Sequence, residues 1–352
     1  MQKLSKVYEE GIQSLNLENY MDHISLAPFQ GITHKYYRHF FIEYFHGINE
    51  VYAPFISGIH PYKVHPGKFD DVIHLPVNHK NYITVPQIVS TSAKEIVAFC
   101  DFLSRHGYLH INWNMGCPFS RLANKMRGCG ILPYPEKVRK ILEEAIPHIK
   151  TLLSVKVRLG YTQKDELRKV LQVLNDFPLE KVIIHPRTGD QLYKGQPDTE
   201  EFDLCRKKSK NTVVYNGNII HQKKFTELKN TFPEVTHWMV GRGALINPFL
   251  PGEIKGMKYT EKQKRKLIGS FHQSLFENTL KRLPNDFKTL GLMKAIWYYM
   301  AGCFANGKEL FRKIKVCQNL SEYEKNVALL MDSKFSDVNE IEDYFYNGLK
   351  HI

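Results

Sequence analysis

The sequence predicts an α/β protein, a (β/α)8 TIM barrel followed by a C-terminal all-helical domain. Short apolar runs alternate with amphipathic segments over roughly the first 250 residues, which is typical of βαβ units and a parallel sheet. About eight such runs occur, which favours a closed barrel; an open doubly wound sheet remains the alternative. The pattern then stops. We therefore expect a barrel domain over residues 1–255 and a helical domain over residues 256–352.

The expected strands are short and rich in β-branched and aromatic residues. They occupy residues 23–26, 51–55, 82–85, 108–113, 153–157, 181–184, 212–215 and 238–240. The second is the weakest candidate, because Pro54 lies inside it. Residues 91–106, 136–149 and 165–175 carry apolar side chains at mostly helical spacing, and the first of these segments begins with a Ser/Thr cap signal.

The chain beyond Pro248 has helical patterns and no strand signal. The expected helices cover residues 259–278, 286–305, 308–318, 321–331 and 336–349. Two basic runs lie here, one made of Lys262, Lys264, Arg265 and Lys266 and the other of Lys308, Arg312, Lys313 and Lys315. Each run fits a surface for an anionic partner and fits an ordinary solvated helix face equally well.

Composition and charge restrict the class of protein. The 352 residues are 43% hydrophobic, enough for a sizeable core, and the net charge of +13 favours an anionic partner such as nucleic acid or a membrane surface. No apolar run approaches the roughly 18 residues of a membrane span, and the first residues lack the apolar region of a signal peptide. The six cysteines form no CxxC pair, so we expect reduced thiols, no metal site and a cytoplasmic location. No obligate protein partner is indicated.

Cys117 lies at the point where an expected strand gives way to a loop. The run before it is rich in aromatic and β-branched residues, and Gly116 and Pro118 then end the strand. Loops that a rigid scaffold positions are where catalytic groups concentrate. A buried structural thiol is the ordinary alternative for Cys117, so this position alone does not decide its role.

Polar or glycine residues stand at the ends of six consecutive expected strands. In chain order they are Gln87, then Asn114 and Cys117, then Lys156 and Arg158, then His185 and Arg187, then Asn216, Gly217 and Asn218, and finally Gly241, Arg242 and Gly243. Active sites of (β/α)8 enzymes lie at these carboxyl ends, and the loops after the last two strands often bind phosphate. Each group alone has an ordinary reading as an exposed edge, a core histidine or a turn. Together they predict a site at one end of the barrel.

With these residues assembled, the chain resembles the tRNA-dihydrouridine synthase family. The most specific stretches are residues 114–118 followed by 127–130, then 155–160, 185–188 with 193–195, 216–219 and 241–245. The resemblance runs from residue 26 to residue 248, with a family-like helical tail after it. Three positions depart from the usual family pattern. Phe29 stands where methionine is usual, Asn218 where aspartate is usual, and Asn112 where an acidic residue is common.

The resemblance implies an FMN-bearing barrel, NADPH as reductant and a uridine of tRNA as substrate. It implies that Cys117 is the catalytic acid. Flavin contacts are then expected from Pro28, Phe29, Gln87, Lys156 and His185, and phosphate contacts from Asn216, Gly217, Asn218, Gly241 and Arg242. Asn114, Arg158 and Arg187 resemble the groups that meet the substrate. The helical tail is expected to bind tRNA.

Reduction of the uracil 5,6 double bond needs a hydride at C6 and a proton at C5. A cysteine thiol with a reference pKa of about 8.5 is mostly protonated near neutrality and can supply that proton. Two other functions stay open at this point. One is an FMN barrel acting on a free small molecule, of the dihydroorotate or enoate type, and the other is an RNA-binding protein without turnover.

Overall fold

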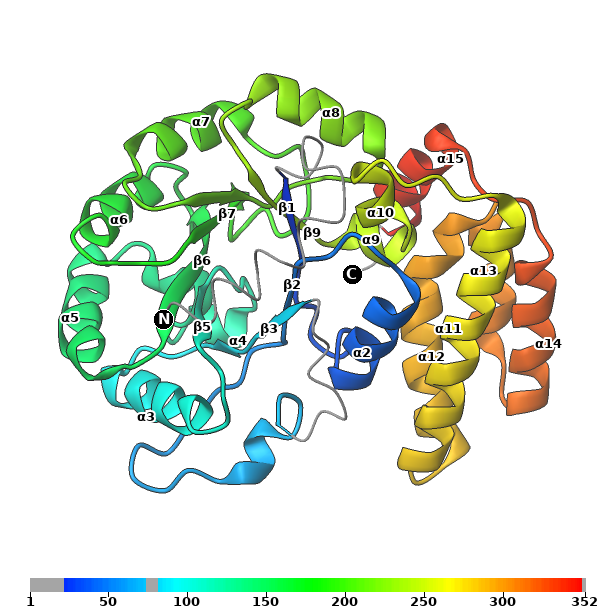
Figure 1. Ribbon diagram of the computed structural model, residues 1–352, viewed down its shortest axis with the longest axis horizontal. Coiled ribbons are helices and arrows are strands. Elements are labelled where there is room, and N and C mark those ends of the chain that lie inside the picture. Colours follow the sequence, from blue (N-terminus) through cyan, green and yellow to red (C-terminus); the bar gives the residue numbers. More distant parts are fainter. Residues whose placement is uncertain (1–21, 74–81, 350–352) are drawn as a thin grey trace, which may run out of the picture.

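The computed structural model describes residues 22–73 and 82–349, and its centre is one parallel sheet curled into a barrel (Figure 1). Within these residues the strands are β1 (His23–Leu26), β2 (Glu50–Tyr52), β3 (Ile83–Val85), β4 (Gln87–Ile88), β5 (His110–Met115), β6 (Leu152–Gly160), β7 (Val182–Thr188), β8 (Val213–Tyr215) and β9 (His237–Val240). Their order in the sheet is β3-β2-β1-β9-β8-β7-β6-β5-β4, and every pair is parallel.

The barrel closes through the segment that contains β3 and β4. β3 pairs with β2 and β4 pairs with β5, so the two ends of the sheet order are neighbours along the chain. Pro86 separates them because it has no N–H for the ladder, but its carbonyl still accepts a 2.9 Å hydrogen bond from the N–H of Asn112. The predicted TIM barrel is therefore confirmed, with its third strand in two pieces, and the open sheet is wrong.

Helices cover the outside of the barrel. The longer ones are α2 (Lys35–Tyr44), α3 (Ala93–Ser104), α5 (Pro135–Ala145), α6 (Glu166–Leu174), α7 (Thr199–Lys208) and α8 (Gln222–Thr231). The α3 helix illustrates their construction: the Ser92 side chain caps its first turn, and Ile96, Phe99 and Leu103 form its buried face. The sequence signals for α3, α5 and α6 are confirmed, whereas α2, α7 and α8 were not predicted as helices.

Short elements follow several strands and shape the loops at one end of the barrel. They are α4 (Ser120–Ala123), the 3₁₀ turn η3 (Gly128–Ile131), α9 (Arg242–Ile246) and α10 (Leu250–Ile254). The first two follow β5, and the last two follow β9, so the loops after these strands are ordered by short helical turns rather than left as long connections.

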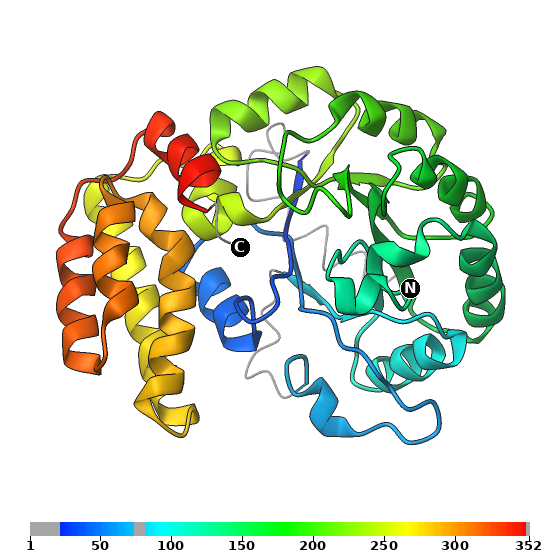
Figure 2. The ribbon, with the colours of Figure 1, turned by 180° about the vertical axis from the view of Figure 1, so that it is seen from behind.

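The C-terminal helices pack against one side of the barrel (Figures 1 and 2). They are α11 (Glu261–Arg282), α12 (Asp286–Met300), α13 (Gly307–Val316), α14 (Leu320–Met331), α15 (Val338–Asp343) and the π-helical turn η6 (Tyr344–Gly348). Phe271 of α11 packs edge-to-face against Tyr37 and Phe41 and at a tilt against Phe45, at ring-centroid distances of 5.4, 6.5 and 5.2 Å. The predicted all-helical tail is thus confirmed, and its buried residues belong to the same apolar cluster as those around the barrel.

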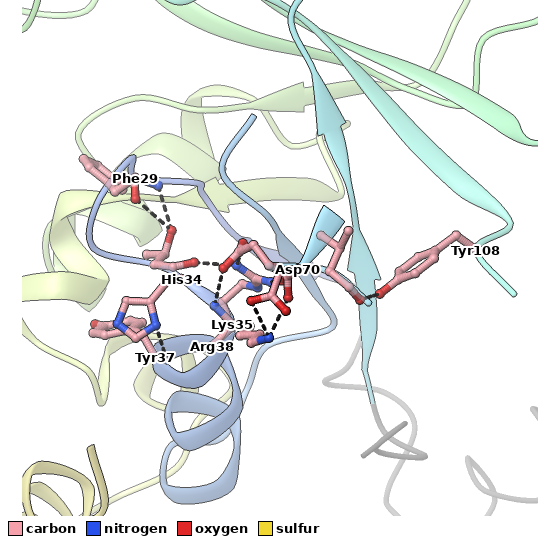
Figure 3. A network of polar contacts seen from close by, with 10 residues as sticks. Phe29, His34, Lys35, Tyr37, Arg38, Asp70 and Tyr108 are labelled. Carbon is pink, nitrogen blue, oxygen red and sulfur yellow. Dashed lines mark hydrogen bonds and ion pairs between the residues drawn. The ribbon is translucent and has the colours of Figure 1, made fainter. Parts of the chain in front are cut away.

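The connection after β2 is tied to α2 by charged side chains (Figure 3). Buried Arg38 donates to the Asp71 carboxylate at 2.8 Å and to the Asp71 carbonyl at 2.6 Å, and Lys35 donates to Asp70 at 2.9 Å. This connection begins at Pro54 and Phe55, which line the pocket described below. The ion pairs therefore anchor the far end of this connection to α2. None of the helices in the described ranges is long and apolar enough to span a membrane.

Candidate active site

A cavity of about 500 Å³ lies at the carboxyl ends of the strands. Its lining includes nearly every residue that the sequence singled out, namely Pro28, Phe29, Gln87, Asn114, Cys117, Lys156, Arg158, His185, Asn216, Gly217, Asn218, Gly241 and Arg242. Arg187 is the exception. The barrel therefore brings residues from positions 28 to 242 into one cavity, while the role of each residue stays a prediction.

Cys117 is held at the edge of this cavity by the end of β5. The Asn114 side-chain oxygen accepts the backbone N–H groups of Gly116 at 3.0 Å and Cys117 at 2.9 Å. Gly128 has φ of +58°, and a Cβ there would lie 2.3 Å from the Cys117 carbonyl oxygen, so only glycine lets η3 pack against this loop. Burial raises the pKa of the Cys117 thiol. The thiol therefore stays protonated near neutral pH and can act as an acid.

Lys156 and Arg158 point from β6 into the cavity. The Arg158 guanidinium donates to the carbonyls of Gly116 at 3.0 Å, Thr188 at 2.8 Å and Leu192 at 2.7 Å. Burial, and then the positive charge of Arg158, lower the pKa of Lys156 to about 7. The charged form of such a desolvated lysine is stabilised by a ligand that brings negative charge or hydrogen-bond acceptors.

The loops after β8 and β9 meet at Arg242. Its guanidinium lies between the rings of Tyr193 and Phe345, 4.5 and 4.2 Å from their centroids. Burial lowers the pKa of Arg242, and its guanidinium donates to the side-chain oxygen of Asn218 at 3.5 Å. A Cβ on Gly243 would lie 2.0 Å from the Ile219 carbonyl oxygen, so glycine permits the close approach of the two loops.

Arg187 lies behind the cavity wall, only 1% exposed. It donates to the Gly195 carbonyl at 2.8 Å, to the Asn218 side chain at 3.1 Å and to His185 Nε2 at 2.9 Å. Burial and the surrounding cations hold the pKa of His185 well below its usual range, so this ring is neutral at pH 7. In this geometry Arg187 orients His185 and Asn218, and its predicted contact with substrate stays a prediction.

The charge of the lining indicates what the cavity can hold. Lys156, Arg158 and Arg242 face it, and the lining residues, all within the described part of the chain, include no carboxylate. Phe29, Met239 and Tyr193 supply apolar and aromatic wall. Cations without acidic partners beside flat apolar surfaces fit an anionic, ring-bearing group. The residues present therefore fit a flavin mononucleotide, which combines a planar ring with a phosphate.

Several lining residues were missed by the sequence reasoning. Tyr299 and Phe345 reach the cavity from the C-terminal helices, and Phe119 and Phe55 lie on its walls. Tyr193 was part of a quoted motif but was given no role. The tail aromatics carried no strand-end signal, because they lie outside the βα pattern.

Fold and cavity together define a parallel barrel with a cation-rich ligand pocket at the carboxyl ends of its strands. A model of the dihydrouridine synthase family (Dus) matches residues 25–335. The chain belongs to the dihydrouridine synthase family, which is a family of flavin-dependent oxidoreductases, and the predicted family membership is confirmed.

Two relatives illustrate the similarity. tRNA-dihydrouridine synthase B of Pasteurella multocida (strain Pm70) is 25% identical over 240 residues, which cover 68% of this chain and 70% of that protein. The probable tRNA-dihydrouridine synthase of Helicobacter pylori (strain ATCC 700392 / 26695) is 34% identical over 147 residues, which cover 41% of this chain and 44% of that protein. The second match thus spans less than half of the relative's length.

Solved structures agree on the fold. A complex of 2-naphthoyl-CoA reductase superposes with a TM-score of 0.51 and 9% identity, covering 66% of this chain and 49% of that one. Histamine dehydrogenase from Rhizobium sp. 4-9 gives a TM-score of 0.50 and 12% identity, covering 66% and 45%. At these identities the likeness concerns the barrel alone.

Proposed function

We propose that this protein reduces the 5,6 double bond of a uridine in tRNA, with FMN as its resident flavin and NADPH as the reductant. The observation that carries the proposal is the buried Cys117 thiol in the lining of a cavity that has several cations and no carboxylate among its described residues. Membership of the dihydrouridine synthase family and the names of the relatives support the substrate.

The proposed chemistry divides between cofactor and protein. When bound, FMN would supply the hydride for C6 of the uracil, and NADPH would supply the electrons that reduce the flavin. Cys117 gives its proton to C5, since its raised pKa keeps the thiol protonated until the substrate arrives. The base must leave its stack to reach the cavity, at a cost of a few kcal/mol.

The other lining residues bind and orient. Lys156, Gln87 and His185 are proposed to contact the flavin ring and its ribityl chain, with Pro28 and Phe29 packed against it. Asn216, Gly217, Asn218, Gly241 and Arg242 are proposed to hold the phosphate, where the Arg242 guanidinium supplies the charge. Asn114 and Arg158 flank the Cys117 loop and are proposed to meet the uracil. We expect the protein to act in the cytoplasm, in keeping with its six free thiols.

The test is reconstitution with flavin, NADPH and an unmodified tRNA transcript. We expect the purified protein to be yellow and to add the mass of two hydrogen atoms to one or more uridines, detected by nucleoside mass spectrometry. Binding of tRNA without this mass change, with the flavin fully reduced, would support the non-catalytic RNA-binding alternative. Turnover of a free enone or dihydroorotate-type compound, but not of tRNA, would support the small-molecule alternative.

The two basic runs of the tail differ in exposure. Half-buried Lys264 forms an ion pair with Glu253 at 2.9 Å, and half-buried Arg265 donates to the Ser333 carbonyl at 3.2 Å. Lys264 therefore ties α11 to α10, at the end of the barrel, whereas Arg265 ties α11 to the turn after α14 within the tail. The run on α13, made of Lys308, Arg312, Lys313 and Lys315, is exposed throughout and is the better candidate for a tRNA surface.

Reversing all four α13 cations to glutamate should weaken tRNA binding and flatten its salt dependence. Each phosphate contact contributes about 0.9 to the slope of log affinity against log salt, so four contacts contribute about 3 to 4. Gel-shift titrations at two salt concentrations measure the change. Flavin content should stay at the wild-type level, because exposed substitutions cost little stability.

A matched control reverses Lys140, Lys169, Lys208 and Lys223, which are exposed on α5 to α8 of the outer barrel wall. This variant carries the same change in net charge and should keep most of the wild-type affinity. Equal binding by the α13 variant and wild type at both salt concentrations would contradict the tail surface. It would favour the cations near the cavity mouth, Arg121, Lys125 and Arg127.

A further inference from the structure

A continuous chain of hydrogen-bonded side chains runs through the interior of the barrel, from the Cys117 loop to β6. We propose that Asn112, which touches neither the cavity nor the reacting atoms, is a positioning residue that holds the Gln87 amide with its N–H toward the cavity. Asn112 and Gln87 are both fully buried. The inference rests on the proposed function for what Gln87 contacts, and on geometry alone for how Gln87 is held.

Backbone groups set the direction of the chain at the cavity end. The N–H groups of Gly116 and Cys117 can only donate, and both point at the Asn114 side chain at 3.0 and 2.9 Å. The oxygen of the Asn114 amide must therefore face them. Its nitrogen is left to donate to Gln87 Oε1, at 2.7 Å.

The same logic fixes the next two amides. Because Gln87 Oε1 accepts from Asn114, Gln87 Nε2 donates to Asn112 Oδ1, at 2.7 Å. Asn112 Nδ2 in turn donates to Ser154 Oγ at 2.8 Å. A rotated Asn112 amide would set two nitrogens against each other, with no water available at this buried position. Asn112 can therefore take only one orientation.

The sheet register places these side chains in a row. Gln87 is the cross-strand partner of Asn112, and Asn112 is the partner of Ser154. Ser154 also lies 2.7 Å from His110 Nε2, and beyond it Glu50 is paired with Lys181 at 2.7 Å. All of these groups are buried, so the row of hydrogen-bonded side chains ends at a buried ion pair and does not reach solvent.

The consequence concerns what Gln87 presents to the cavity. Its oxygen accepts from Asn114 and one of its N–H bonds is donated to Asn112, so its second N–H is the donor that Gln87 can offer to a ligand. A donor at this place favours a ring that gains negative charge on reduction, and an oxygen there would oppose it. Asn112 thus acts on the flavin only through Gln87.

Three variants separate positioning from plain structural support. Asn112→Leu removes both hydrogen bonds at similar size. Asn112→Asp keeps an acceptor for Gln87 and can accept the Ser154 hydroxyl, so it should restore the wild-type arrangement. Ser154→Ala disturbs the same buried row but leaves the bond between Asn112 and Gln87, so it serves as the matched control.

The first measurement needs no flavin and no substrate. In the flavin-free protein, alkylation of Cys117 is followed by peptide mass spectrometry, since Asn114 links Gln87 to the Cys117 loop. Asn112→Leu should be labelled about two- to tenfold faster than wild type, the range that one lost hydrogen bond gives. Asn112→Asp and Ser154→Ala should be labelled at the wild-type rate.

The second measurement uses the flavin-loaded protein. Asn112→Leu should move the flavin midpoint potential to more negative values and lower kcat with little change in KM for tRNA, and Asn112→Asp should reverse both effects. Ser154→Ala should lower the unfolding temperature without moving the potential. If Asn112→Leu leaves both labelling and potential unchanged, or Ser154→Ala shifts them equally, the positioning role is wrong. If the protein proves inactive on tRNA, the labelling result still decides the inference.

Discussion

Replacing Cys117 with alanine should lower the rate of uridine reduction about 10²- to 10⁴-fold, the contribution that a general acid typically makes. Burial raises the pKa of this thiol, so it carries its proton at neutral pH, and the alanine variant has nothing to donate. Single-turnover formation of dihydrouridine from pre-reduced flavin measures the loss. Oxidation of NADPH by the flavin should survive, because that half-reaction needs no proton from the protein to the substrate.

Cys129 provides the control for this experiment. Its thiol is fully buried and is not among the residues that line the cavity, and burial raises its pKa to about 12. Cys129→Ala should therefore retain the rate of product formation. A wild-type single-turnover rate for Cys117→Ala would show that the acid is another group, and Cys129 would be the next thiol to test.

Replacing Arg242 with alanine should weaken FMN binding about tenfold to a hundredfold. A charge-assisted hydrogen bond is worth roughly 1.5–3 kcal/mol, and here the half-buried guanidinium lies over the rings of Tyr193 and Phe345. Fluorescence titration of the flavin-free protein gives the dissociation constant. The FMN dissociation constant of Arg242→Lys should lie between those of the wild type and Arg242→Ala, because lysine keeps the charge but lacks the planar guanidinium.

Riboflavin is the internal control, since it has the flavin ring and no phosphate. The Arg242→Ala substitution should leave riboflavin affinity close to wild type while it lowers FMN affinity. An equal loss for both ligands would mean that Arg242 supports the pocket through packing. An unchanged FMN dissociation constant would show that the phosphate does not bind at the loops after β8 and β9.

The fold and most of the cavity lining follow from local sequence patterns. Apolar runs with regular spacing define the strands, and a parallel barrel necessarily brings all their carboxyl ends to one rim. This is why Gln87, Lys156 and Gly241, far apart in the chain, could be grouped before their distances were known. The strand lengths were less accurate: β6 and β7 continue to Gly160 and Thr188, because Arg158 and His185 are buried within the strands and not in loops after them.

Contacts between distant segments were beyond that reasoning. Arg187 has the same strand-end signal as His185, yet its side chain turns behind the wall toward the carbonyls of Lys194 and Gly195. Lys264 and Arg265 were assigned to a basic surface, but Lys264 donates to the Glu253 carboxylate and Arg265 donates to the Ser333 carbonyl. In each case the hydrogen-bond partner lies on a loop or on another helix. The spacing of residues within one segment cannot predict such a contact.

The ring of Phe345 on Arg242 also has a consequence for biosynthesis. Translation proceeds at about 5–20 residues per second, so roughly 5 to 20 s pass between the synthesis of Arg242 and that of Phe345. During that interval every barrel strand already exists, but one face of the guanidinium is uncovered on the nascent chain. The cavity wall is complete only when η6 (Tyr344–Gly348) has docked on the barrel, so we expect a cofactor to bind tightly after the tail has packed and not before.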